Sequence, residues 1–220
     1  GNISEDPLYC NADNGDYGLQ GISPCLPGNN SCGVYMGALG MACHTRSLWY
    51  VESGGSGDAA TIQAAIDSAI TGDTVMVAAG TYTGGGNRDI RTHGKPILVA
   101  SESGRDVTVI DCESAAGDNH YGFKVMDNED TTTVVRGFTV TRASNAGVYI
   151  NQSGPIIEDC LLTENSPFDG DYGGGVIAMT STSIIRNCVV SEDSTTFDGG
   201  GILCYGPGTD MLIENCSVTG

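Results

Sequence analysis

Three stretches in the second half of the chain share one pattern: IIEDCLLTENS (residues 156–166), IIRNCVVSEDS (184–194) and LIENCSV (212–218). Each begins with an apolar pair, continues with a charged residue and an Asp or Asn, and then has a cysteine in the same slot. Related stretches occur earlier, TVIDC at 108–112 and VVRGFTV at 134–140. Self-similarity of this kind indicates a repeat architecture in which each repeat is one structural unit.

The repeats also share a spacing and a second marker. Neighbouring cysteine slots lie between 22 and 28 residues apart, and a glycine followed by apolar residues runs alongside them. The slot residues are Cys112, Phe138, Cys160, Cys188 and Cys216, and the glycines are Gly122, Gly147, Gly175 and Gly201. The intervening segments are short aliphatic and β-branched runs bounded by turn residues, which predicts strands rather than helices.

This pattern predicts an all-β fold, a right-handed parallel β-helix with one coil per repeat. Leucine-rich repeats have a similar period but need a Leu/Asn frame that this chain lacks. Coils stack about 4.8 Å apart, so equivalent residues of successive repeats lie above one another. We therefore expect the five slot residues to form a buried core ladder with free thiols, because buried cysteine behaves as a small hydrophobic residue. Disulfides between adjacent coils are the alternative.

Two further columns follow from the same alignment. The Asp/Asn slot is expected at a bend, where these side chains hydrogen-bond the turn. The residue before it is expected to form an outward ladder of alternating charge. The bend residues are Asp111, Asp159, Asn187 and Asn215, and the charged residues are Arg136, Glu158, Arg186 and Glu214.

The composition narrows the classes of partner. The chain has 27 acidic against 9 basic residues and a net charge of −18. This argues against nucleic acid, whose phosphates need a basic surface, and against anionic membranes as partners. No apolar run approaches the ~18 residues of a membrane span, so we expect no membrane insertion. Acidity suits a soluble secreted protein, and it also permits calcium, which prefers oxygen ligands.

Residues 1–46 form a separate turn-rich extension with four cysteines. Such a segment predicts two disulfides, for which we favour Cys10–Cys43 and Cys25–Cys32 among the three pairings, and a secreted, extracellular or cell-surface location. Zinc is the alternative, although the spacings lack a paired CxxC. The β-helix domain is expected over residues 47–220.

The stretch LWYVESGGSGDAATIQAAIDSAITGDTVMVAAGTY (48–82) resembles the opening of pectin-lyase-like parallel β-helix proteins of the secreted or surface bacterial type. Its residues 61–70 have an apolar stripe typical of a short amphipathic helix. The resemblance implies that this helix caps the first coil. It also implies a superfamily that includes lyases, hydrolases, adhesins and structural stalks, so it constrains the fold more than the activity.

Residues 1–46 resemble the closing segment of such proteins, through SEDPLYC and DYGLQGISPC, but here they precede the first coil. An uncapped solenoid end is an exposed sheet edge and core, which natural proteins cover. We therefore expect end-to-end continuation, either in a longer tandem chain or by capping of a neighbouring subunit. Sideways packing of residues 1–46 on their own solenoid is the third alternative. The expected interface residues are Ile3, Pro7, Leu8, Tyr9, Ile213, Cys216 and Val218.

The sequence singles out no catalytic residue. Polysaccharide lyases need a carboxylate cluster with calcium beside an Arg or Lys base. Asp169, Asp171 and Asp198 are the candidate calcium ligands, although Asp and Gly in turns have a structural explanation. Further carboxylates are Asp127, Glu129 and Asp130, the nearest bases are Arg136, Arg142 and Arg186, and the aromatic candidates for a sugar groove are Tyr149, Phe168, Tyr172, Phe197 and Tyr205.

The sequence thus predicts a structural subunit of an extracellular filament, stalk or adhesin, assembled head to tail. The alternative is a polysaccharide-active enzyme, a uronate lyase or glycoside hydrolase, or a carbohydrate-binding module. Calcium is the candidate cofactor, and the expected partners are further copies of the chain or a polysaccharide.

Overall fold

The computed structural model describes residues 9–11, 16–19, 23, 25, 48–115, 119–166, 174–194 and 200–219. The chain forms two compact units, Gly1–Ser47 and Leu48–Gly220. In the first unit, strands β1 (Tyr9–Asn11) and β2 (Asp16–Leu19) pair antiparallel.

The cysteines of the first unit are described only in part. Cys25 is buried, and because Cys32 lies outside the described residues the Cys25–Cys32 disulfide stays a prediction. Cys32 and Cys43 lie outside the described residues, as does the side chain of Cys10. The Cys10–Cys43 pairing therefore stays a prediction.

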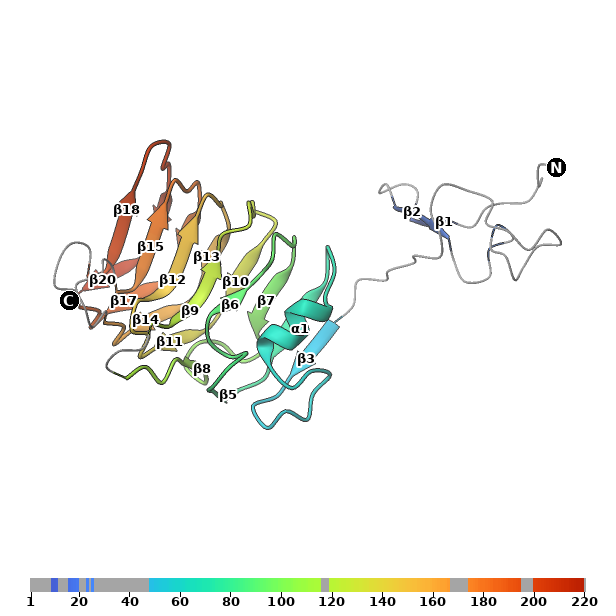
Figure 1. Cartoon of the computed structure of the whole chain (residues 1–220), viewed down its shortest axis with the longest axis horizontal. Helices are drawn as coiled ribbons and strands as arrows, with labels where there is room; N and C mark the ends of the chain where they lie inside the picture. The colour runs from blue at the N-terminus through green and yellow to red at the C-terminus, as the bar shows by residue number, and fades with distance from the viewer. Residues whose placement is uncertain are drawn as a thin grey trace. The chain divides into compact units, whose positions relative to one another are not determined.

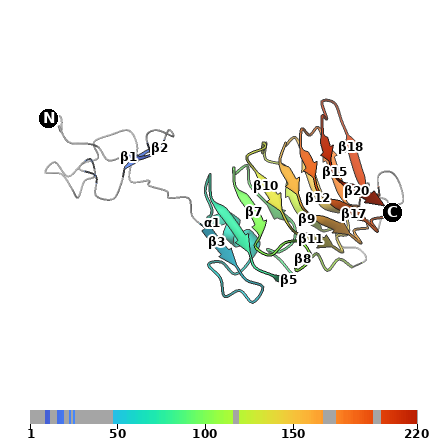
Figure 2. The same cartoon turned by 180° about the vertical axis from the view of Figure 1, so that it is seen from behind.

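The second unit is a parallel β-helix whose coils stack along one axis (Figures 1 and 2), which confirms the predicted fold. Its seven-stranded sheet contains β3 (Leu48–Val51), β4 (Thr74–Val77), β7 (Leu98–Ser101), β10 (Val134–Arg136), β13 (Ile156–Glu158), β16 (Ile184–Arg186) and β19 (Leu212–Glu214). Its six-stranded sheet contains β5 (Gly80–Tyr82), β8 (Thr108–Asp111), β11 (Thr139–Thr141), β14 (Leu161–Thr163), β17 (Val189–Ser191) and β20 (Ser217–Thr219). Its five-stranded sheet contains β6 (Ile90–Arg91), β9 (Tyr121–Val125), β12 (Ala146–Asn151), β15 (Val176–Met179) and β18 (Ile202–Tyr205).

The register of the stack corrects one member of the predicted cysteine ladder. Phe138, Cys160, Cys188 and Cys216 directly precede strands that pair in register, so they form one column. In β8 that position belongs to Thr108, because Val109 pairs with Thr139. Cys112 is also a buried free thiol, and burial raises its pKa to about 12, but it follows β8 instead of preceding it. The Asp–Cys pair at 111–112 therefore matches the repeat motif in sequence only, because it stands at the end of a strand, whereas in the repeats the pair precedes the strand.

The bend before the six-stranded sheet requires a left-handed backbone. Gly137, Asp159, Asn187 and Asn215 have φ values of 80°, 55°, 54° and 52°. Glycine, Asn and Asp adopt this region most readily, which explains the Asp/Asn slot of the repeats. Asp111 was wrongly placed in this slot, since it lies within β8.

The predicted ladder of alternating charge is confirmed. Arg136 pairs with Glu158, Glu158 with Arg186, and Arg186 with Glu214 in the register of the seven-stranded sheet. Arg186 donates from Nε to Glu158 Oε2 at 2.7 Å, whereas Nη1 of Arg136 lies 3.6 Å from Glu158 Oε1.

Helix α1 (Ile62–Ser68) packs at the β3 end of the stack (Figure 1). The hydroxyl of Thr61 caps its first turn by accepting the Ala64 N–H at 3.1 Å. Its buried side chains, Ile62, Ala65 and Ile66, belong to the same hydrophobic core as the inward residues of the coils. The helix is one residue shorter at its start and two at its end than the predicted 61–70, and it covers the core that the first coil would expose.

A column of glycines lines the start of the five-stranded sheet. The register stacks Gly122, Gly147, Gly175 and Gly201. A Cβ at Gly175 would lie 2.6 Å from the carbonyl oxygen of Gly201 and would overlap Cγ1 of Val190. The column marks a place where two sheets approach too closely for any side chain, which is why the glycine recurs in the sequence.

A buried amide and a buried carboxyl stack at the corner after the six-stranded sheet. Asp193 Oδ1 accepts from the backbone N of Asn165 at 2.8 Å and from its Nδ2 at 3.1 Å. Asn165 Nδ2 also donates to the Val140 carbonyl at 3.1 Å. Asp193 Oδ2 is buried without a hydrogen-bond partner among the described residues. Burial raises the pKa of Asp193 to about 7, against 3.8 for an exposed Asp.

Substitution of the glycine column should destabilise the stack. We expect Gly175→Ala to lower the free energy of unfolding by about 1–3 kcal/mol, because the added methyl overpacks the contact with Val190. Gly85→Ala is the matched control, since a Cβ there meets nothing within 4 Å. Urea unfolding measures both, and equal effects of the two substitutions would contradict this account of the column.

The buried carboxyl predicts a specific pH dependence of stability. Because the folded pKa is raised, the contribution of Asp193 is full below about pH 4 and is lost as pH rises to about 7. The free energy of unfolding of Asp193→Asn should not fall over this pH range, because the amide does not ionise. The change that the substitution causes in this free energy should therefore be more favourable at pH 8 than at pH 4, by up to about 4 kcal/mol. Denaturant melts across pH test this, with Asp159→Asn, an exposed carboxylate, as the charge control. Parallel pH curves for wild type and Asp193→Asn would refute it.

Candidate functional site

The outer face of the five-stranded sheet carries a row of five side chains, of which Ile177 is buried and the other four are half-buried. Arg91, Lys124, Tyr149, Ile177 and Leu203 follow one another along the stack, because each pairs with the next in register. The residues that alternate with them along the strands, such as Phe123, Val125, Val148 and Ile150, are buried in the core. Cationic, aromatic and aliphatic side chains thus follow in that order along this face.

Two tyrosines and a lysine form a platform at the middle of this row: Lys124 and Tyr149 belong to the row, and Tyr121, the first residue of β9, contacts both of them. The ring centroids of Tyr121 and Tyr149 lie 5.3 Å apart, with the ring planes tilted by 52°. The Nζ atom of Lys124 lies 4.8 Å from the centroid of the Tyr121 ring, a cation–π contact. The Tyr149 hydroxyl donates to Sδ of Met179 at 3.6 Å. All three platform side chains are half-buried, so each keeps a surface that a ligand can reach.

Lys124 differs from every other described Lys and Arg. In the described part of the chain, it alone has neither a carboxylate nor a backbone carbonyl as a partner. The others are engaged as follows: Arg88 with Cys112 and Glu113, Arg91 with Asp127, Lys95 with α1, Arg105 with the carbonyls of Cys160 and Asn187, Arg136 and Arg186 with Glu158, and Arg142 with Asp111. Lys124 is therefore the cation that remains available to an anionic or hydroxyl-rich ligand.

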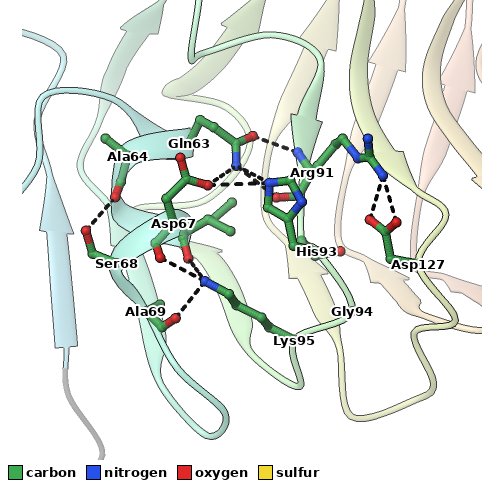
Figure 3. Close-up of polar contacts among 12 residues, drawn as sticks. Gln63, Ala64, Asp67, Ser68, Ala69, Arg91, His93, Gly94, Lys95 and Asp127 are labelled. Carbon is green, nitrogen blue, oxygen red and sulfur yellow. Dashed lines mark hydrogen bonds and ion pairs between the residues drawn. The ribbon is translucent and has the colours of Figure 1, made fainter.

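Arg91, beside Lys124, is fixed in place by its surroundings (Figure 3). Its Nη2 donates to both carboxylate oxygens of Asp127, at 2.7 and 2.9 Å. Gln63 of α1 exchanges two hydrogen bonds with the Arg91 backbone, at 2.8 and 3.1 Å. In the same view, Lys95 donates to three carbonyls at the end of α1, among them that of Ile66 at 2.7 Å. The cap helix thereby holds the strand end that borders the platform.

Glu129 is a structural carboxylate next to this region. It accepts from the Thr92 hydroxyl at 2.6 Å, the Gly94 amide at 2.9 Å and the Ser153 hydroxyl at 2.8 Å. Burial alone would raise the pKa of Glu129, but the hydrogen bonds from the Thr92 hydroxyl and from the Gly94 and Asp127 amides outweigh it and hold the pKa below its ordinary value. Glu129 thus ties adjacent coils together and stays ionised.

The predicted calcium ligands Asp169, Asp171 and Asp198 lie outside the described residues, as do the aromatic candidates Phe168, Tyr172 and Phe197. Among the residues that are described, no three His, Cys, Asp or Glu side chains cluster as metal ligands. The carboxylates of Asp127 and Asp130 have structural partners in Arg91 and Thr132. The candidate bases Arg136, Arg142 and Arg186 are all ion-paired, with Glu158, Asp111 and Glu158 respectively.

The expected assembly residues are described only at one end. Ile213 and Val218 stand in the inward columns below Ile185 and Val190, yet they are 44% and 50% exposed. Cys216, which lies between these two residues in the sequence, is half-buried. Ile3, Pro7 and Leu8 lie outside the described residues, as does the side chain of Tyr9.

Sequence reasoning found Tyr149 but missed Tyr121 and Lys124. The signal was present, since aligning YGFKV with AGVYI on their glycines places Lys124 beside Tyr149. The contact with Tyr121 comes from ring packing across coils, which a column alignment does not contain. The platform offers what saccharide recognition uses: aromatic faces for sugar rings and a cation for hydroxyl or carboxylate oxygens.

Comparisons with known proteins agree with this architecture. The family described as "Right handed beta helix region" matches residues 97–220. The chain resembles the crystal structure of pectate lyase Pel9A with a TM-score of 0.53 and 19% identity, over 77% of this chain and 52% of that one. It resembles a pectin methylesterase mutant in complex with a hexasaccharide with a TM-score of 0.53 and 15% identity, over 80% of this chain and 67% of that one.

Those similarities establish the fold alone, and the chain spans about half the length of the pectate lyase. Comparison with curated protein sequences gives no match. In the described residues, no helix has the length and apolar character of a membrane span.

Proposed function

Because the chain belongs to the right-handed β-helix family, we propose that it binds a polysaccharide along the outer face of its five-stranded sheet. The observation that carries this proposal is the platform of Tyr121, Lys124 and Tyr149, in which Lys124 has no carboxylate or carbonyl partner among the residues that the structure describes. The ligand lies along the stack axis, because the row that contains the platform runs in that direction.

The chemistry of the platform favours an acidic saccharide. The tyrosine faces stack on sugar rings, and Lys124 pairs with a uronate carboxylate where the protein is otherwise strongly acidic. The solved structures of similar fold are a pectate lyase and a pectin methylesterase with a bound hexasaccharide, which supports this ligand class. An extracellular location is part of the proposal, and the acidic composition and the cysteines of residues 1–46 support it.

Binding should depend on both kinds of platform side chain. We expect Tyr149→Ala to weaken binding of oligogalacturonate about tenfold, equivalent to about 1.4 kcal/mol, through loss of ring stacking. Lys124→Ala should weaken binding of the acidic oligomer to a similar degree but leave a neutral oligoglucan unaffected. Isothermal titration calorimetry with both oligomers measures these effects.

The matched control is Tyr50→Ala on the outer face of the seven-stranded sheet, whose hydroxyl donates to Glu102 at 2.6 Å. It should leave oligogalacturonate affinity unchanged. The proposal fails if wild type binds neither oligomer, or if Tyr50→Ala weakens binding as much as Tyr149→Ala.

A second candidate function is head-to-tail self-association, in which residues 1–46 of one copy cover the last described coil of the next. The observation that favours it is the exposure of Ile213 and Val218 in columns that are otherwise buried. Such a heterologous contact generates an open polymer unless it closes into a ring. The filament, stalk or adhesin role predicted from the sequence would follow from this contact.

Negative-stain microscopy and sedimentation test the second candidate. We expect concentration-dependent filaments from the full chain, and their loss in Ile213→Asp, which places a charge on the contact surface. A chain that stays dispersed at all concentrations, or filaments that persist in Ile213→Asp, would refute it.

A further inference from the structure

The outer face of the seven-stranded sheet carries two parallel rows over β10, β13, β16 and β19. The apolar row consists of Val134, Ile156, Ile184 and Leu212, and the charged row consists of Arg136, Glu158, Arg186 and Glu214. The residues between the rows in β10, β13 and β16 are fully buried, so both rows face outward. Leu212 is 47% exposed, and the other three apolar residues are half-buried.

The charges of this face are unevenly satisfied. Glu158 forms ion pairs with both Arg136 and Arg186. Its Oε2 atom lies 2.5 Å from Nη2 and 2.7 Å from Nε of Arg186. Arg136 reaches Glu158 only at 3.6 Å, which is too long for a hydrogen bond. The carboxylate of Glu214 has no ion-pair partner among the described residues. The two incompletely paired charges, Arg136 and Glu214, are therefore opposite in sign and lie in the first and last of these four described strands.

The order of the charges is self-complementary. Over the four described strands the row alternates in sign, so reversing these four residues places every Arg opposite a Glu. A two-fold axis parallel to the strands, passing between β13 and β16, performs this reversal when two copies meet face to face. It places Arg136 opposite Glu214 of the second copy, and Glu214 opposite Arg136 of the second copy.

The same axis also matches the apolar rows. It reverses the direction of the stack but leaves each residue at its position along the strand, so the apolar row meets the apolar row. Ile156 then faces Ile184 of the second copy, and Val134 faces Leu212 of the second copy. A two-fold axis along the stack would instead place charges on apolar side chains, which costs desolvation without pairing.

We propose that this face is an isologous dimer interface between two copies of the chain. The interface is smaller than the ~800 Å² per partner of a standard complex, because it spans only four strands of three residues each. The dimer is therefore weak and reversible, and its charged pairs make it sensitive to salt. A two-fold contact also closes at two copies, unlike the head-to-tail contact considered above.

A charge-swap experiment on the full chain tests the proposal. Sedimentation velocity over a concentration series should show a monomer–dimer equilibrium for wild type. Arg136→Glu and Glu214→Arg should each weaken dimerisation by about tenfold or more, because each places like charges opposite one another twice per dimer. The double variant Arg136→Glu with Glu214→Arg should restore wild-type dimerisation, since the pair is re-formed with its signs exchanged.

The matched control is Glu192→Arg. It makes the same charge change as Glu214→Arg, but at an exposed corner after β17. Arg142 occupies the equivalent position in another coil, so an arginine is tolerated there. It should dimerise like wild type, and circular dichroism should confirm that all variants are folded. The proposal is overturned by a wild type that stays monomeric at the highest soluble concentration. It is also overturned if the double variant remains as weak as the single ones.

Discussion

The structure depends on one constraint: each coil of the β-helix is hydrogen-bonded to the next in parallel register, so a residue's column is fixed by its neighbours above and below. Because the coils stack in register, a local conformational requirement recurs at the equivalent position of every coil and selects the same residue types there. The left-handed bend selects Asp159, Asn187 and Asn215, and the close approach of two sheets selects the glycine column. The burial of Val135, Ile157 and Ile185 follows from the same register.

The sequence predicted the features that repeat and failed where they do not. The coil type, the glycine column, the charge ladder and the cap helix follow from periodic patterns, which the pairing register preserves. The assignment of Cys112 to the ladder failed because an Asp–Cys pair can stand before or after a strand, and composition does not distinguish the two ends. The contact of Lys124 with Tyr121 depends on side-chain packing and cannot be read from spacing. The burial of the Asp193 carboxyl could not be predicted from the sequence, because it depends on the packing of Asn165 against it in the adjacent coil.

The two outer faces show how a repeat fold separates its tasks. The core columns specify the architecture and leave the outward positions free to vary between sheets. On the five-stranded sheet they hold an aromatic and cationic platform suited to an extended saccharide. On the seven-stranded sheet they hold apolar and charged rows suited to a second copy. The two surfaces lie on different sheets of the same coils, so substitutions on one should leave the function proposed for the other unchanged.

The register of the stack is tested most directly by a distance between two residues of one column that are far apart in sequence. Thr81 and Ser217 are both exposed and are linked through successive pairs in the six-stranded sheet. Double electron–electron resonance between nitroxides at these positions should give a narrow distribution centred near ~24 Å, five coil spacings of about 4.8 Å. A broad distribution, or one centred well beyond this distance, would contradict parallel in-register stacking and every column derived from it.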